Sequence, residues 1–292
     1  MKTMQKSSSI CTLEVPVPTC SMGFTLLEIL VALAMGFIFI TALFTLIIHQ
    51  TKSHEDHQMK VMMQQNGRAA LAVIGNDLML AGYSPVPRDD GGSGRLATFR
   101  VAGMTHMDFT FDANADGDID EKDSAENNIY IERTVLEYFD ASNQLGRNNN
   151  TNRLLQDVEA FRVLYAYDAD DLGAGSGSYG VLEKEADAVR WAYDSTPEDT
   201  ELKLTHYYTL DAAGKLAGDD VAETPIEGPD PSLDRIRAAK IWLLIRSNKR
   251  KAQNTFENQV DFIPDFSVRG LDTANYSYRL YTTTVKFRNM YY

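Results

Sequence analysis

The stretch from Gly23 to Ile48 is largely apolar and carries a single charge, Glu28. A helix rises about 1.5 Å per residue, so this stretch is long enough to cross a hydrocarbon core of about 30 Å. A charge inside a membrane span costs at least about 2.5–3.5 kcal/mol, and it normally persists only where a specific partner meets it. The sequence therefore predicts a membrane-spanning helix over residues 24–48 in which Glu28 has a specific task.

The polar segment at the start of the chain precedes this apolar run. Residues 1–22 contain Lys2, Lys6 and two prolines. An ordinary secretory signal has an apolar core of about 7–15 residues, and its cleavage site follows that core. Here the order is reversed, so removal of a leader of residues 1–23 would leave the apolar helix with the mature protein. The alternative is an ordinary signal anchor that contains one glutamate.

The junction GFTLLE, with the apolar run that follows it, resembles the N-terminal signature of type IV pilins. In that family a prepilin peptidase cuts between glycine and phenylalanine and N-methylates the phenylalanine, and a glutamate at the fifth mature position guides assembly. The resemblance implies that Gly23 and Phe24 form the cleavage junction, that Phe24 is methylated, and that Glu28 acts in assembly. It also implies that the head lies in the periplasm, on a chain anchored once in the inner membrane.

Charge and cysteine usage restrict what the head can bind and how it is held together. The formal net charge is −13, which argues against nucleic acid or anionic lipid as a partner. Both cysteines, Cys11 and Cys20, lie in the leader. The mature chain is therefore expected to have no disulfide, even in an oxidising compartment.

A single long helix is expected over residues 24–83, because no proline occurs between the apolar run and Pro85. Gly82 is expected to end it, since glycine is a common C-terminal cap. Helical glycine costs about 1 kcal/mol relative to alanine, so local melting is expected near Gly36. Gly67 and Gly75 are further expected weak points. One apolar stripe, which is expected to pack on a sheet, is formed at helical spacing by Leu71, Ile74, Leu78 and Ala81.

Residues 84–292 are expected to form a β-rich head. The predicted strands are rich in β-branched and aromatic residues and lie at 97–101, 107–111, 128–133, 135–140, 158–167, 238–247 and 278–287. The segments 91–94, 173–180 and 218–234 are predicted loops. The predicted fold class is therefore α+β, and the resemblance implies a type IV pilin fold with one long N-terminal helix packed on an antiparallel sheet.

Four head segments resemble the PilW branch of minor pilins: 68–83, 143–170, 234–247 and 285–289. This resemblance implies a low-abundance subunit that helps to initiate, cap or modify a type IV pilus. The implied partners are the prepilin peptidase, other major and minor pilins and the pilus assembly platform. A J-type pseudopilin of type II secretion shares the long helix and remains an alternative.

An acidic loop at residues 112–123, DANADGDIDEKD, has the ligand spacing of an EF-hand calcium loop. Gly117 takes the sixth position, where a sharp turn is needed. The predicted oxygen ligands take positions 1, 3, 5, 7, 9 and 12: Asp112, Asn114, Asp116, Asp118, Asp120 and Asp123. The alternative is an acidic surface turn, because position 12 is not the usual bidentate glutamate and predicted strands, not helices, flank the loop. A weaker cluster, Asp168, Asp170 and Asp171, is more typical of a solvated turn.

The sequence contains no recognisable catalytic constellation, and we expect the protein not to be an enzyme. The segment HEDH, which includes His54 and His57, lacks the HExxH spacing of a zinc protease. No GxSxG elbow is present. An alternative of another class is a membrane-anchored, calcium-dependent adhesin that uses the pilin N-terminus only for export.

Overall fold

The computed structural model describes residues 24–83, 99–112, 120–122, 128–148, 151–168, 189–196, 203–208, 224–226, 233, 236–247, 263–266, 271–273 and 275–287. The chain divides into two compact units, residues 1–51 and residues 52–292. Helix α1 (Leu26–Leu80) contributes its first half to one unit and its second half to the other. We describe each unit by itself.

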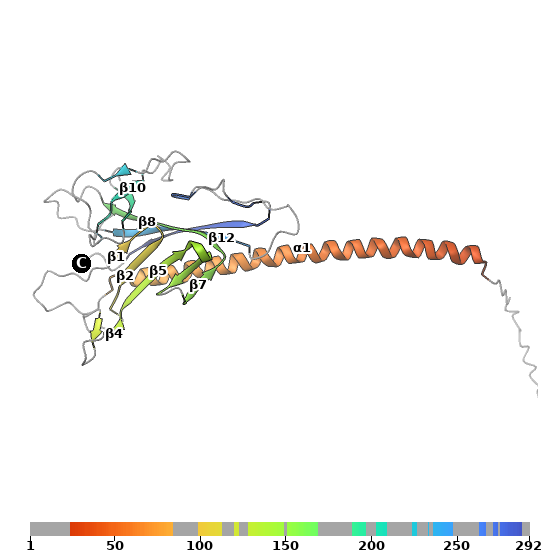
Figure 1. The fold of residues 1–292 in the computed structure, drawn as a ribbon, viewed down its shortest axis with the longest axis horizontal. Coiled ribbons are helices and arrows are strands. Elements are labelled where there is room, and N and C mark those ends of the chain that lie inside the picture. Colours follow the sequence, from red (N-terminus) through yellow and green to blue (C-terminus); the bar gives the residue numbers. More distant parts are fainter. Residues whose placement is uncertain are drawn as a thin grey trace, which may run out of the picture. The chain divides into compact units, whose positions relative to one another are not determined.

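In the first unit, α1 is one uninterrupted helix (Figure 1). Its side chains there are exposed. It remains helical through Gly36, so the expected local melting there is absent from the structure. The threonine hydroxyls are satisfied within the helix: Thr41 donates to the carbonyl of Phe37 at 2.7 Å, and Thr45 donates to that of Thr41 at 2.9 Å. Such internal bonds matter in an apolar surrounding, because an unpartnered hydroxyl would be costly there.

In the second unit, one face of α1 is buried against the strands. Its buried residues are Met63, Gly67, Ala70, Ile74, Gly75 and Leu78, which recur at the three- and four-residue spacing of one helix face. Ala81 is also buried and Leu71 is partly buried, so the predicted stripe is confirmed. The helix ends as predicted at Gly82, which has the left-handed φ of 69° that favours glycine.

A six-stranded antiparallel sheet forms the larger part of the head. Its strand order is β11-β10-β9-β8-β12-β13. The strands are β8 (Val158–Asp168), β9 (Val189–Tyr193), β10 (His206–Tyr208), β11 (Thr224–Pro225), β12 (Ile236–Arg246) and β13 (Tyr278–Lys286). β12 is central and almost fully buried, which explains its nearly continuous apolar sequence. β11 falls within the segment 218–234 that was predicted as a loop.

A second antiparallel sheet has five strands in the order β1-β2-β5-β6-β7. They are β1 (Phe99–Ala102), β2 (His106–Thr110), β5 (Arg133–Phe139), β6 (Gln144–Arg147) and β7 (Arg153–Gln156), and a short helix η1 (Asp140–Ser142) joins β5 to β6. A separate pair consists of β3 (Asp120–Lys122) and β4 (Asn128–Ile131). One helix with antiparallel sheets confirms the predicted α+β class.

An aromatic cluster joins the two sheets. The ring of Phe99 on β1 lies 5.5 Å from that of Tyr165 on β8 and 5.3 Å from that of Phe287, which follows β13. Phe109 on β2 lies 5.9 Å from Phe99. All four rings are buried, and aromatic pairs at this spacing are each worth about 0.5–1.5 kcal/mol beyond burial alone.

Gly67 provides the closest approach between α1 and the six-stranded sheet. A Cβ atom added at Gly67 would lie 2.5 Å from Cε2 of Tyr281 on β13, so only glycine leaves room for that ring. The Tyr281 hydroxyl donates a hydrogen bond to the carbonyl of Met63 at 3.1 Å and fixes the ring across the helix. Gly67 is therefore a packing site, which corrects its interpretation as a weak point.

We predict a strong coupling between Gly67 and Tyr281. Gly67→Ala gains about 1 kcal/mol of helix propensity but forces the ring out of its place, and overpacking typically costs about 1–3 kcal/mol. In a Tyr281→Ala background the same substitution should stabilise the protein by about 1 kcal/mol. Denaturant unfolding of the full chain in detergent, carried out as a double-mutant cycle, measures the coupling. Additive effects of the two substitutions would contradict the close contact.

Candidate functional site

Glu28 lies in a reciprocal cap at the start of α1. Thr25 precedes the helix, and its hydroxyl accepts a hydrogen bond from the Glu28 backbone N–H at 3.3 Å. In return, Oε2 of Glu28 lies 3.4 Å from both the backbone nitrogen and the hydroxyl of Thr25. This is the capping-box arrangement, which satisfies two of the four free N–H groups at a helix start. The sequence TLLE contains this signal, and our sequence analysis missed it.

Small side chains follow Glu28 along one helix face. Ala32 and Gly36 lie four and eight residues after Glu28, which places them in one row with the carboxylate. This part of α1 is apolar enough and long enough to cross a membrane. In lipid, small side chains let two helices approach closely. Phe24 is exposed at the start of the described chain, and Gly23 lies outside the described residues.

An ion pair connects α1 to the five-stranded sheet. Arg147 at the end of β6 donates from Nε to Oδ2 of Asp77 at 2.7 Å and from Nη2 to Oδ1 at 3.1 Å. The Asp77 side chain is only 12% exposed, so this two-pronged pair is largely shielded from water. A guanidinium and a carboxylate joined by two hydrogen bonds fix each other's orientation and also stabilise the contact. The pair therefore sets the rotation of the helix against this sheet.

The predicted calcium loop lies only partly within the described residues. Asp112 directly follows β2, and Asp120 begins β3, while Asn114, Asp116, Asp118 and Asp123 lie outside the described part. No group of three or more His, Cys, Asp or Glu residues with metal-binding geometry occurs among the residues that the structure describes. Residues 120–122 of the loop form β3, which pairs with β4, and β4 lies within the strand predicted at 128–133.

Asp112 is anchored where the helix end meets the five-stranded sheet. Its backbone N–H donates to the carbonyl of Tyr83 at 2.7 Å, and the N–H of Gly82 donates to the carbonyl of Thr110 at 2.9 Å. The adjacent Phe111 N–H donates to the carbonyl of Glu132 at 3.0 Å. Asp112 is fully buried and Glu132 is 2% exposed. The first residue of the loop, Asp112, is thus buried, and its backbone is held by a hydrogen bond to the end of the helix.

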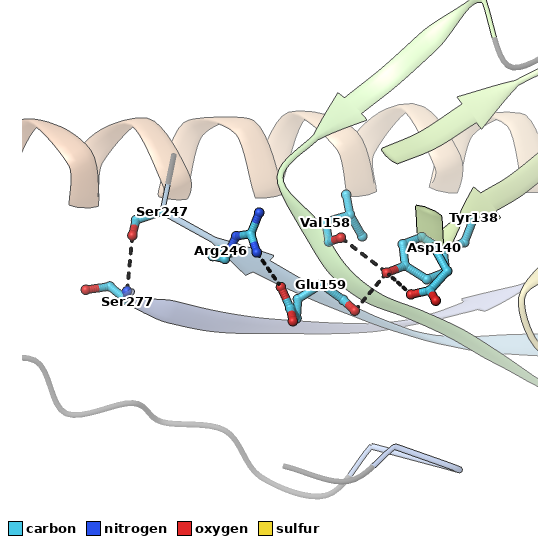
Figure 2. A network of polar contacts seen from close by, with 7 residues as sticks. All are labelled: Tyr138, Asp140, Val158, Glu159, Arg246, Ser247 and Ser277. Carbon is cyan, nitrogen blue, oxygen red and sulfur yellow. Dashed lines mark hydrogen bonds and ion pairs between the residues drawn. The ribbon is translucent and has the colours of Figure 1, made fainter. Parts of the chain in front are cut away.

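A polar network lies where η1 and the first residues of β8 meet the end of β12 (Figure 2). The Tyr138 hydroxyl donates to the carbonyl of Glu159 at 2.9 Å and lies 3.3 Å from Oδ1 of Asp140. Arg246 forms an ion pair with Oε2 of Glu159 at 3.4 Å, and its guanidinium lies 4.9 Å from the ring centre of Tyr276. These residues tie the two sheets together at one end of the head.

Burial dominates the proton affinities in this network. The pKa of Glu159 is raised because desolvation disfavours its charge, an effect that Arg246 opposes and Asp140 reinforces. Desolvation and the nearby Asp140 also raise the pKa of the Tyr138 hydroxyl. The pKa of Arg162, on the same strand as Glu159, is lowered by burial. Because its described contacts join β5 and η1 to β8 and β12, we assign the network a structural role.

The histidines noted in the sequence do not gather into a site. His49, His54 and His57 are exposed, and the His54 ring lies 3.0 Å from Nε2 of Gln58 on the next helical turn. His206 stacks on Tyr193 at 5.8 Å, on the six-stranded sheet. Asp168 ends β8, while Asp170 and Asp171 lie outside the described residues.

Comparisons with known proteins identify a matching family and a similar solved structure. The family described as Type IV Pilus-assembly protein W matches residues 119–289, which is more than half of the chain. Among solved structures, a type IV-like pilin from Thermus thermophilus is similar with a TM-score of 0.35 and 13% sequence identity, over 79% of this chain and 100% of that one. A comparison with curated proteins finds no match.

We predict that the network around Glu159 makes stability depend on pH. A folded-state pKa above the usual 4.5 means that the folded chain holds its proton more tightly than the unfolded chain. This contribution is fully present below about pH 4.5 and is lost as the pH rises through the raised pKa. Glu159→Gln cannot ionise, so its melting temperature should fall less between about pH 4 and 7. If the melting temperatures of wild type and Glu159→Gln fall by the same amount between about pH 4 and 7, this assignment is wrong.

Proposed function

Because the chain belongs to the PilW family of type IV pilus-assembly proteins, we propose that it is a minor pilin that helps to initiate, cap or modify the filament. The observation that carries this proposal is the combination of a PilW head with an exposed apolar helix that begins with one carboxylate, Glu28. Subunits of this kind are structural, and we propose no catalytic activity.

The environment of Glu28 supports a role in contact with other subunits. In the described chain its carboxylate caps its own helix, with only Oε2 engaged. Cleavage after Gly23 would create an α-amino group at Phe24, about one helical turn away. We propose that a carboxylate in lipid, beside the small residues Ala32 and Gly36, pairs with such an amino group when the helices of two subunits pack.

The location and partners follow from the same reasoning. We propose that prepilin peptidase cuts after Gly23 and methylates Phe24, that the chain then resides in the inner membrane with its head in the periplasm, and that it joins other pilins through the assembly platform. The family match favours this over a J-type pseudopilin or an adhesin that uses the helix only for export. Recovery of the chain in sheared filaments separates these alternatives.

We further propose that residues 112–123 bind calcium. Asp112, the first of the six oxygen-bearing positions, is fully buried and held by backbone hydrogen bonds at the end of β2. The six side chains carry five carboxylates, which repel one another without a cation. A calcium ion bound to them would order this loop in a head that has no cysteine.

We predict that Glu28→Ala is processed normally but is missing from filaments. Intact-mass measurement of the membrane-bound chain should give a methylated N-terminus at Phe24 for both wild type and variant. Immunoblots of sheared filaments should show at least a tenfold loss for Glu28→Ala, since the loss of a buried charged contact typically costs about 2–5 kcal/mol.

Thr25→Ala is the matched control for this experiment. It removes the hydroxyl of the capping box but keeps the Glu28 carboxylate, and the loss of a cap costs only about 0.5–2 kcal/mol of helix stability. Thr25→Ala should therefore remain in filaments. Equal loss of both variants would assign Glu28 to capping alone. A mature N-terminus other than Phe24 would overturn the processing proposal.

We predict that calcium stabilises the full chain in detergent. Extracellular calcium sites of this type bind at about 10⁻⁴–10⁻³ M, so about 10 mM calcium should add roughly 1.4–2.7 kcal/mol to the free energy of unfolding. Melting temperatures in calcium, magnesium and chelator measure this effect. Asp116→Ala should abolish it, whereas Asp140→Ala, which removes an exposed acidic residue outside the loop, should not. Identical melting of wild type in calcium and in chelator would exclude the site.

A further inference from the structure

The six-stranded sheet ends in two very different edges. At one edge, β11 has only two residues, and one of them is Pro225, which has no N–H to offer a further strand. At the other edge, β13 has nine residues, and all nine pair in register with β12 without a bulge. Within the described residues no strand pairs with the far side of β13.

The register shows which backbone groups of β13 face outward. The N–H of Phe287 donates to the carbonyl of Arg237 at 3.0 Å, and the N–H of Ser247 donates to the carbonyl of Ser277 at 2.8 Å. Hydrogen-bonded pairs alternate along an antiparallel ladder, so the odd-numbered residues of β13 bond to β12. The even-numbered residues, among them Leu280, Thr282 and Thr284, direct their N–H and carbonyl groups away from the sheet.

This outward side lacks most of the features that usually protect an edge strand. Natural edges are blunted by proline, a bulge, charged side chains (lysine above all) or shortness. β13 has nine residues with no proline and no bulge, its one lysine is its last residue, and the run from Thr282 to Thr284 has high β-propensity and no charge. Thr282, Thr284 and Lys286 are exposed. The charged groups lie towards the ends of the strand: Lys286 closes it, and the guanidinium of Arg279 lies 5.7 Å from the ring centre of Tyr281.

We propose that β13 is a docking edge that receives an extended segment of a different protein chain as a seventh strand of this sheet. Main-chain hydrogen bonds to Leu280, Thr282 and Thr284 supply the affinity, as in other strand-addition complexes. The segment has no proline at its bonding positions, and it carries an acidic side chain that meets Lys286. A second copy of β13 fits less well, because the strand contains two basic residues and no acidic residue.

Strand pairing at β13 is independent of the proposed role in a filament. A partner strand can bind this edge whether the chain initiates, caps or modifies a filament, and its binding does not depend on Glu28 or on processing at Phe24. Loss of filament incorporation and loss of strand pairing are therefore separate outcomes.

Photo-crosslinking in the cells that naturally make the protein tests the proposal on the full chain. A photoreactive amino acid is placed at Thr282 or at Thr284 on the edge, and at the exposed Ala141 in η1 as a control. The two edge positions should crosslink to one segment of one partner chain. Because strands pair residue by residue, moving the probe by two residues should move the crosslinked residue by two within that segment. Mass spectrometry of the crosslinked peptides gives both positions.

Proline substitution separates the edge from the rest of the strand. Thr282→Pro removes an outward N–H and keeps the bonds to β12, so the yield from a probe at Thr284 should fall about tenfold while the melting temperature changes little. Thr282→Val keeps the N–H and should retain the crosslink. Three results would overturn the proposal: no crosslink from either edge position in a folded chain, scattered partners like those of Ala141, or crosslinks to β13 of another copy.

Discussion

The fold of the head depends on the close contact between the second half of α1 and the strands. Because Gly67 has no side chain, the ring of Tyr281 can lie against the helix backbone. Asp77 forms a bidentate ion pair with Arg147 of the five-stranded sheet. The first contact sets the distance between helix and sheet, and the second sets the rotation of the helix. Between them, Ile74 and Leu78 are fully buried, each worth about 1.5–3 kcal/mol relative to exposure.

The two sheets are held by means other than covalent bonds. Phe99 brings together rings from β2, β8 and the residue after β13, and the polar network around Glu159 and Arg246 closes the opposite end of β8. Aromatic packing and partly buried polar contacts thus act where small exported domains often use disulfides.

Much of this architecture was predictable from the sequence, because long periodic segments leave little choice. The helix, its stripe at Ile74 and Leu78, its end at Gly82, and the long strands β8, β12 and β13 all followed from apolar spacing and turn residues. The short strands β3, β6, β7, β9, β10 and β11 were missed, since two to five residues carry too little periodicity. Gly67 was misread because its value lies in a partner 214 positions along the chain, Tyr281, which no local pattern reveals. The capping box of Thr25 and Glu28 has a recognisable sequence pattern, TLLE, but the same residues begin the apolar run, and Glu28 was interpreted only as a charge in a membrane span.

The exposed apolar surface of the first half of α1 restricts the surroundings in which this chain is stable. Phe37, Ile38 and Phe39 are each about two-thirds or more exposed, and most of the large side chains from Phe24 to Ile48 are at least half exposed. Wetting all of them would cost tens of kcal/mol at about 1.5–3 kcal/mol per side chain. In water this surface is therefore strongly unfavourable, and this half of the helix is stable only where lipid or another protein surface covers each turn.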